Sequence, residues 1–197
     1  MPRSHPILRT ATLLAAATML TSTAPTRADA QATFPADAIH GMKWRHIGPF
    51  RAGRTKSGVG VATQPNVFYM APTNGGVWKS TDYGRTWNPI FDAMPTGSVG
   101  ALEVAPSDPN IVYVGSGEGL QRPDLSTGDG MYRSADAGKT WTKLGLNDGQ
   151  QIPRIAIDPA NPDRLFVAVL GHPYGPNAER GIYRSTDGGR SFARVLY

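Results

Sequence analysis

From residue 55 onward, the chain alternates short hydrophobic runs with clusters of glycine, proline, asparagine and aspartate. In the middle of this region the hydrophobic runs cover residues 99–105, 111–115, 130–134 and 139–144. Valine, isoleucine, tyrosine, phenylalanine and tryptophan fill such runs in strands, and the residues between them favour turns. No helical spacing of hydrophobic residues is present, so the pattern predicts four short strands here and no helix.

The same succession of elements occurs three times along the chain. An eight-residue motif, Ser-x-Asp-x-Gly-x-Thr/Ser-Trp/Phe, recurs about every 50 residues, at 80–87, 134–141 and 185–192. A Pro-Asn or Pro-Asp turn and a hydrophobic run precede each copy, at 64–71, 108–115 and 161–171. Four strands in every repeat of this length are typical of β-propeller blades. The predicted fold class is all-β, with about three propeller blades of four antiparallel strands, which is an incomplete ring because closed propellers have four to eight blades.

The repeated motif is predicted to be a structural turn between the third and fourth strands of each unit. Its glycine permits a positive φ, and its aspartate can accept hydrogen bonds from backbone amides of its own turn. The aromatic residue that ends the motif is free to pack between sheets. We therefore assign a structural and not a catalytic role to Ser80, Asp82, Gly84, Trp87, Ser134, Asp136, Gly138, Trp141, Ser185, Asp187, Gly189 and Phe192.

Residues 1–30 have the features of an export signal. Arg3 and Arg9 form a positively charged start, a short hydrophobic stretch follows at 10–20, and Ala28-Asp29-Ala30 fits a small-x-small cleavage site. We expect an exported protein, periplasmic or extracellular, with no membrane span after cleavage. The remaining organisation is predicted as a linker at 31–41, a lone strand at 42–48 that completes the last blade of a full propeller, and blades at 55–92, 97–146 and 151–197.

Composition and charge exclude several classes of site. The chain has no cysteine, which excludes disulfides, cysteine-ligated zinc and thiol nucleophiles. The net charge is +5, but the lysines and arginines are scattered, so no nucleic-acid partner is expected. No stretch supplies the spaced oxygen ligands of a calcium loop, and we predict no metal and no cofactor. The oligomeric state is left open by the sequence.

The motif S-x-D-x-G-x-T-W resembles the Asp-box, or BNR repeat. The stretches HIGPFRAGR (46–54), GGVWKSTDYGRTW (75–87) and LGHPYGPNAERGIYRSTDGG (170–189) resemble secreted bacterial proteins described as sortilin N-terminal-like or as BNR-repeat glycosyl hydrolases. This resemblance implies an exported propeller, of which the chain is interpreted as an N-terminal fragment. The alternative is a small protein that closes its ring by oligomerising.

Ligands are expected at the end of the blades opposite the motif. The loops between the second and third strands lie there, at 72–76, 117–130 and 171–181, and the long middle loop mixes charges. Long loops on a rigid scaffold tend to carry binding function. The predicted ligand-binding residues are Arg51, Arg54, Asn74, Arg122, Arg154, His172, Tyr174 and Arg180.

Catalysis is the alternative function for the same loops. Glycoside hydrolysis needs a pair of carboxylates, for which the candidates are Glu118, Asp124, Asp129 and Glu179. The resemblance to xyloglucan-cleaving hydrolases implies a catalytic aspartate in a T-D-x-G-G setting, where this chain has Asn74, and an amide cannot act as a general base. The sequence therefore favours a binding module without enzymatic activity, whose ligand is a protein, a peptide or a polysaccharide. A xyloglucanase-like endoglucanase with catalytic acids in further blades, and a scaffold in a surface assembly, are the alternatives.

Overall fold

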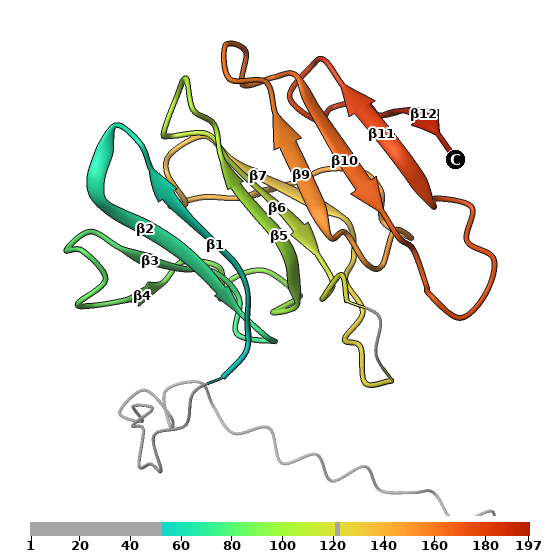
Figure 1. Ribbon diagram of the computed structural model, residues 1–197, viewed down its shortest axis with the longest axis horizontal. Coiled ribbons are helices and arrows are strands. Elements are labelled where there is room, and N and C mark those ends of the chain that lie inside the picture. The colour runs from blue at the N-terminus through green and yellow to red at the C-terminus, as the bar shows by residue number, and fades with distance from the viewer. Residues whose placement is uncertain (1–52, 121–122) are drawn as a thin grey trace, which may run out of the picture. The chain divides into compact units, whose positions relative to one another are not determined.

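The described part of the chain forms three four-stranded sheets. The computed structural model describes residues 53–120 and 123–197, which contain strands and connecting loops and no helix (Figure 1). Sheet 1 consists of β1 (Thr55–Val61), β2 (Gln64–Pro72), β3 (Trp78–Ser80) and β4 (Asn88–Pro89). Sheet 2 consists of β5 (Val99–Val104), β6 (Val112–Ser116), β7 (Met131–Ser134) and β8 (Thr142–Lys143). Sheet 3 consists of β9 (Arg154–Ile157), β10 (Leu165–Val169), β11 (Gly181–Ser185) and β12 (Ala193–Leu196).

Within each sheet, strands that follow one another in the chain pair in antiparallel fashion. The first strands of the three sheets, β1, β5 and β9, lie beside one another from sheet to sheet (Figure 1). These are the sheets of an incomplete β-propeller, and the predicted fold class is confirmed. The described residues contain no helix that is long and apolar enough to cross a membrane. The predicted export signal, linker and lone strand at 42–48 lie outside the described residues.

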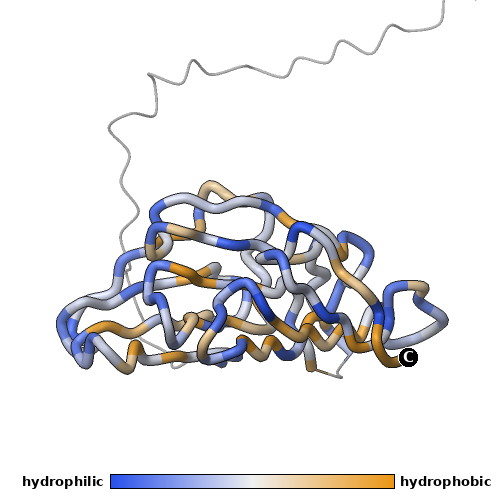
Figure 2. The backbone as a smooth tube through the Cα atoms, turned by 90° about the horizontal axis from the view of Figure 1, so that it is seen from above, coloured by the Kyte–Doolittle hydropathy of each residue, from blue (hydrophilic) through white to orange (hydrophobic). Residues whose placement is uncertain are grey.

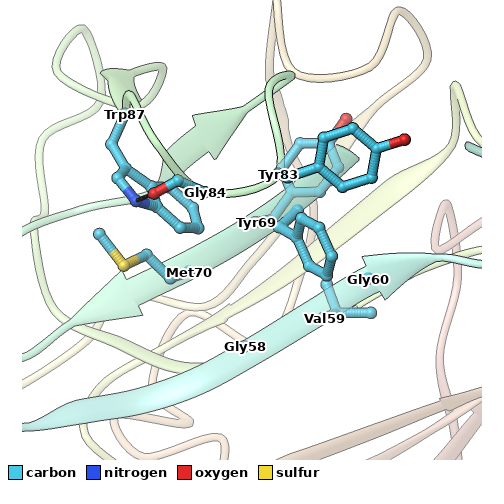
Figure 3. Close-up of a pocket in the computed structure, with 9 residues that line it drawn as sticks. Gly58, Val59, Gly60, Tyr69, Met70, Tyr83, Gly84 and Trp87 are labelled. Atoms are coloured by element: carbon cyan, nitrogen blue, oxygen red, sulfur yellow. Dashed lines mark hydrogen bonds between the residues drawn. The ribbon is translucent and has the colours of Figure 1, made fainter. Parts of the chain in front are cut away.

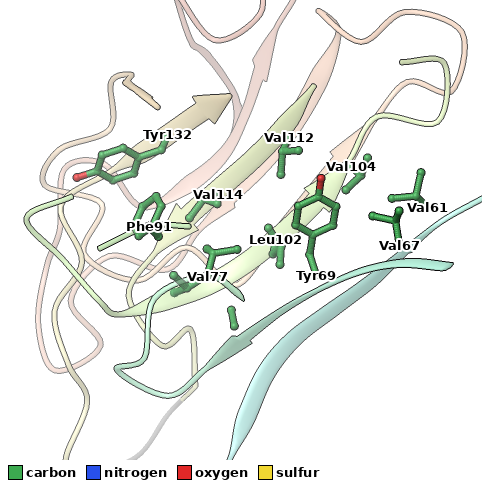
Figure 4. Packing of buried hydrophobic residues seen from close by; sticks show 12 residues of the cluster. Val61, Val67, Tyr69, Val77, Phe91, Leu102, Val104, Val112, Val114 and Tyr132 are labelled. Carbon is green, nitrogen blue, oxygen red and sulfur yellow. The ribbon is translucent and has the colours of Figure 1, made fainter. Parts of the chain in front are cut away.

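One hydrophobic cluster fills the interface between sheets 1 and 2 (Figure 4). Alternate residues of β2, among them Tyr69, are buried there, as expected for a strand with one face against a neighbour. Phe91 lies in the connection between the sheets, and its ring meets those of Tyr132 and Trp141 edge to face, with centroids 5.2 and 5.1 Å apart.

A second cluster fills the interface between sheets 2 and 3, with Tyr113, Met131 and Ile155 fully buried in it. The central strand β6 is buried along its whole length, whereas β10 buries alternate residues. The difference follows from position, because sheet 2 is covered on both faces and sheet 3 on one. Hydrophobic and hydrophilic stretches accordingly alternate along the traced chain (Figure 2).

The repeated motif forms the same hydrogen-bonded turn in all three sheets. In sheet 2 the buried Ser134 hydroxyl donates to Asp136 Oδ1 at 2.8 Å and accepts the Gly138 amide at 2.8 Å. The Asp136 carboxylate then accepts the Thr140 amide at 2.8 Å and the Thr140 hydroxyl at 2.6 Å. Sheets 1 and 3 repeat these contacts through their own serine and aspartate. The hydrogen-bonding groups of the three aspartates are thus used within their own turns.

The motif also binds the Pro-Asn or Pro-Asp turn that precedes it in each repeat. The fourth residue of the motif donates its amide to the carbonyl of that turn, from Tyr83 to Asn66, from Ala137 to Asn110 and from Gly188 to Asp163. All three donors have a positive φ, which the sequence predicted only for the glycine that follows them. Both turns of a sheet therefore lie at one end of the strands, here called the motif end, and the remaining connections lie at the opposite loop end.

Candidate functional site

Three loops and two connections between sheets form the loop end. The loops join β2 to β3, β6 to β7 and β10 to β11. Backbone hydrogen bonds tie the first two loops to the connections, from Gly76 to Gly97, from Gly117 to Ser98 and from Gly128 to Gln150, at 2.8–3.0 Å. The bases of these loops are therefore fixed by the sheets that carry them.

Two buried polar residues hold the long loop between β6 and β7. The Ser116 hydroxyl donates to the Gly130 carbonyl at 2.7 Å and accepts the Asp129 amide at 2.7 Å. The Gln151 side chain accepts the Gly119 amide at 2.8 Å and donates to the Ser126 carbonyl at 2.9 Å. The Gln151 carbonyl accepts the amide of Leu170 on the next loop, so one residue couples the second loop to the third.

Glycine is required where this loop leaves and rejoins its sheet. A Cβ atom on Gly117 would overlap the Gln150 carbonyl oxygen, and Gly117 also has a positive φ of 87°. A Cβ atom on Gly128 would overlap the Gly117 amide nitrogen and Ser116. The two backbone segments approach each other so closely that only glycine fits at these two positions. The base of the loop is therefore compact and well defined.

Asn74 lies in the first loop on the wall of a pocket of about 290 Å³. It is exposed and has a φ of 55°, a left-handed conformation that asparagine and aspartate tolerate better than most residues. The Gly75 amide closes the turn on the Pro72 carbonyl at 3.0 Å. Asp92, from the connection to sheet 2, lines the same pocket and is exposed. No local pattern points to Asp92, because the connection enters this pocket only through the folding of two segments against each other.

The predicted catalytic carboxylates occupy different environments in the second loop. Glu118 is 1% exposed, whereas Asp124 is exposed. Asp129 accepts the Tyr132 hydroxyl at 2.6 Å and forms an ion pair with Lys143 at 2.8 Å. Burial acts to raise the pKa of Asp129, but the hydrogen bonds from Lys143 and Tyr132 outweigh burial and leave its pKa below the usual value. Asp129 is therefore drawn toward the third and fourth strands of its own sheet and stays ionised.

The third loop is organised by Arg180. Its guanidinium donates to the carbonyls of Leu170, His172 and Gly175 at 2.5–2.9 Å. Three carbonyls of its own loop thus engage this predicted ligand-binding residue. His172 lies on the same loop, half-buried, and Tyr174 is 65% exposed there.

Glu179 follows Asn177, a buried residue that ties the third loop to the connection between sheets 2 and 3. The Asn177 side chain donates to the Asp148 carbonyl at 3.0 Å and accepts the Glu179 amide at 2.9 Å. Glu179 is half-buried, and its Oε2 atom is buried with no hydrogen-bond partner among the described residues. Of the four candidate carboxylates, Glu118 is buried and Asp129 is held by Tyr132 and Lys143. Asp124 and Glu179 remain as candidates for the chemistry of the site.

The remaining predicted residues lie apart from these groups. Arg54 is exposed, and its carbonyl accepts the Thr73 amide at 2.9 Å. Arg154 is the first residue of β9 and is exposed. Its positive charge acts on Glu103, whose pKa is raised by burial, and opposes that rise. Arg51 and Arg122 lie outside the described residues. Among residues 53–120 and 123–197, no group of three histidine, aspartate or glutamate side chains is placed to hold a metal ion.

Several known proteins with similar sequences or folds are xyloglucanases. No protein-family profile matches the chain. A xyloglucanase of Hypocrea jecorina is 27% identical over 186 residues, covering 83% of this chain and 20% of the relative. A xyloglucanase of Acetivibrio thermocellus is 28% identical over 169 residues, covering 66% of this chain and 18% of the relative. The crystal structure of a GH74 xyloglucanase from Xanthomonas campestris has a TM-score of 0.57 at 23% identity and covers 84% of this chain and 25% of that one. The chain thus spans about a fifth of the length of these curated relatives.

These comparisons overturn the preference for a chain without enzymatic activity. The relatives are enzymes by name, so the expectation that leaned away from an enzyme is wrong. That expectation rested on Asn74 and on the long loop at 117–130, which was interpreted as a binding element, and a single amide in one loop does not decide the chemistry of a site that several loops build. The resemblance to hydrolase-type propellers is confirmed at the level of fold. The sortilin likeness, the Asp-box identity, export and a peptide ligand stay predictions.

Proposed function

We propose that this chain is part of a β-propeller glycoside hydrolase that acts on xyloglucan or a related β-glucan at its loop end. The observation that carries the proposal is the sequence similarity to xyloglucanases over most of the chain. The loop end offers what a polysaccharide site needs: exposed carboxylates, an exposed tyrosine ring and loops whose bases are rigid. The motif end is proposed to be structural, since its aspartates are held within their own turns.

Acid and base roles are proposed from the environment of each carboxylate. Glycoside hydrolysis needs one carboxyl group that donates a proton and a second that acts as base or nucleophile. We assign the base role in the first pocket to Asp92, which shares that pocket with Asn74 and carries the carboxylate that Asn74 lacks. Asp129 is unsuited as a general acid, because Lys143 holds it ionised. Asp124 and Glu179 are the proposed contributors from the second and third loops.

Release of reducing ends from xyloglucan, measured with the protein and three variants, tests the proposal. Asp92→Asn is expected to lower the rate by about 10²-fold or more, the usual contribution of a general base. Asn74→Asp is expected to raise the rate, because the left-handed turn accepts aspartate and the pocket gains a second carboxylate. Asp108→Asn is the matched control, since this residue lies in a turn at the motif end and should leave the rate unchanged.

A binding assay distinguishes recognition of the polysaccharide from cleavage of its glycosidic bond. The chain should be retarded in gels that contain xyloglucan. Glu179→Gln and Asp124→Asn should retain this retardation if these residues act on the glycosidic bond rather than in binding the chain of sugars. A protein that neither binds nor cleaves xyloglucan or another β-glucan would overturn the proposed function.

A further inference from the structure

The proposed acid–base chemistry depends on the loop end, and a hollow on sheet 1 shows the contrast. The hollow measures about 480 Å³ and lies over β1 and β2, with Tyr83 and Trp87 in its wall (Figure 3). Trp87 Nε1 donates to the Gly84 carbonyl there at 3.0 Å, within the motif turn. None of the described residues that line this hollow has a carboxylate, so it offers contact but no general acid or base.

Gln151 lies in the connection between sheets 2 and 3 and closes the second loop across its base. It is 2% exposed, and both polar atoms of its side chain are hydrogen-bonded. Its Oε1 accepts the Gly119 amide at 2.8 Å, on the limb that leaves β6, and its Nε2 donates to the Ser126 carbonyl at 2.9 Å, on the limb that returns to β7. We call these two hydrogen bonds the Gln151 clamp. Asp124 lies in the chain between the two residues that the clamp holds.

The Ser126 carbonyl is also bonded to the connection between sheets 1 and 2. Ser98 is 4% exposed, and its hydroxyl donates to the Ser126 carbonyl at 3.3 Å. The Ser98 carbonyl accepts the Gly117 amide at 3.0 Å. The same connection carries Asp92, the proposed base, a few residues before Ser98. The connections on both sides of sheet 2 therefore meet at one carbonyl of the second loop.

The third loop is attached to Gln151 through the backbone. The Gln151 carbonyl accepts the Leu170 amide at 2.9 Å, and the Leu170 carbonyl accepts Arg180 Nε at 2.7 Å. Glu179, the proposed contributor from this loop, directly precedes Arg180. Gln151 is therefore linked to all three segments that carry a proposed catalytic carboxylate.

We propose that Gln151 is a positioning residue, which holds these three segments in the relative placement that hydrolysis requires. This role rests on the proposed function. Because Gln151 is buried, it acts through the segments that it holds and not on the substrate. A neutral amide suits the position, since the side chain must accept from one limb and donate to the other at once. A misplacement of about 1 Å lowers a rate by about 10²-fold, so loss of the clamp should affect turnover more than binding.

The Gln151→Glu variant tests the two hydrogen bonds of the clamp separately. An ionised carboxylate still accepts the Gly119 amide but cannot donate to the Ser126 carbonyl, whereas a protonated carboxyl group does both. Burial and the facing carbonyl oxygen disfavour the charged form, so the pKa of the new group should lie above the usual value of about 4.3. Relative to the parent at the same pH, kcat on xyloglucan should be about 10²-fold lower near pH 8 and should recover by about tenfold or more near pH 5.

Two further variants control for packing and for charge. Gln151→Met keeps the length of the side chain without its hydrogen bonds, and it should lower kcat at every pH with no recovery in acid. The ionisable residues next to the clamp in the chain, Glu118, Asp148 and Arg154, remain in this variant, so any titration of theirs would appear there too. Gln64→Glu makes the same change of charge at an exposed position of the motif end and should follow the parent. In both Gln151 variants KM should change less than kcat, and circular dichroism like that of the parent shows that the sheets are retained.

Hydrogen exchange of backbone amides in the full chain tests the clamp without a substrate. Relative to the parent at the same pH, Gln151→Met should exchange the Gly119 amide faster by about tenfold or more, because its acceptor is gone. Ionised Gln151→Glu should keep Gly119 protected and speed exchange at Gly128, on the returning limb, whose amide donates to the Gln150 carbonyl.

The outcomes separate the clamp from the proposed function. A parent that does not cleave xyloglucan or another β-glucan would overturn the proposed function, and the exchange rates would still show whether Gln151 holds the loop. Exchange at Gly119 and Gly128 that is unchanged in both variants would overturn the clamp. An active parent whose Gln151→Glu variant keeps the parent's rate and pH dependence would overturn the positioning role.

Discussion

The buried hydroxyl of Ser134 is the most informative single group to remove from the fold. It is fully buried, donates to Asp136 and accepts the amides of Gly138 and Asp136 at 2.8 and 3.2 Å. Ser134→Ala leaves the buried Gly138 amide without its acceptor, which costs about 1–3 kcal/mol. It also removes a hydrogen bond to a charged carboxylate, a contribution of about 1.5–3 kcal/mol that is partly recovered from water at this solvent-facing turn. The expected loss in the free energy of unfolding is therefore about 2–4 kcal/mol.

Urea denaturation followed by tryptophan fluorescence measures this loss, because Trp141 belongs to the same motif and packs on Phe91. In thermal melts the same loss lowers Tm by roughly 4–16 °C for a domain of this size. Ser107→Ala, in an exposed turn, is the matched control and should change the free energy of unfolding by less than about 0.5 kcal/mol. If Ser134→Ala proved as mild as this control, the motif would not be a structural device and its repetition would need another explanation.

Three further predictions concern acid stability, sheet contacts and the loop end. Hydrogen bonds from the Thr140 side chain and backbone lower the pKa of Asp136 from 3.8 to about 2, and the other two motif aspartates shift alike. The stabilisation of the fold by these three ionised aspartates is present above about pH 4 and is lost as the pH falls through about 2. Tm measured against pH should therefore fall over this acid range, and Asp136→Asn should make the fall smaller. Tyr113→Phe removes the hydrogen bond from the hydroxyl to the Pro162 carbonyl of sheet 3 and the one that it accepts from Arg133 within sheet 2. Urea denaturation should therefore show a loss of about 1–2 kcal/mol, and a loss within error would contradict the role of the hydroxyl. Gly128→Ala forces a Cβ atom against backbone and should cost about 1–3 kcal/mol in the same assay, whereas Gly53→Ala, with open space around it, should not; equal effects would refute the close approach.

Local pattern was sufficient to predict the strands and their order, because each strand here is a hydrophobic run with one turn signal at either end. The middle repeat shows this: the strand expected at 99–105 is Val99–Val104, and the one expected at 111–115 is Val112–Ser116. The fourth strand of the middle repeat was predicted as longer than it is. The run at 139–144 yields only Thr142–Lys143, since its first residues belong to the motif turn and Trp141 turns inward to donate to the Ile90 carbonyl at 2.7 Å.

The candidate site could be predicted only in outline. The antiparallel order of the strands places all second-to-third-strand loops at one end, which follows from sequence alone. It does not reveal that Arg180 is engaged by carbonyls of its own loop, that Glu118 is buried, or that Asp92 shares a pocket with Asn74. These facts depend on how segments distant in the chain pack against each other, and no local rule encodes that packing.

The repeat, the all-β class and the turn chemistry could be predicted from the amino-acid sequence, because a strand, a Pro-Asn turn and a self-contained aspartate turn depend on residues close together in the chain. Which side chains face a neighbouring sheet follows only from the packing of the sheets. Tyr69, Tyr113 and Phe166 occupy equivalent positions, yet two are buried and one is exposed. The reason is that burial depends on whether another sheet lies against the face, and the same local pattern serves both the filled interfaces and the open one.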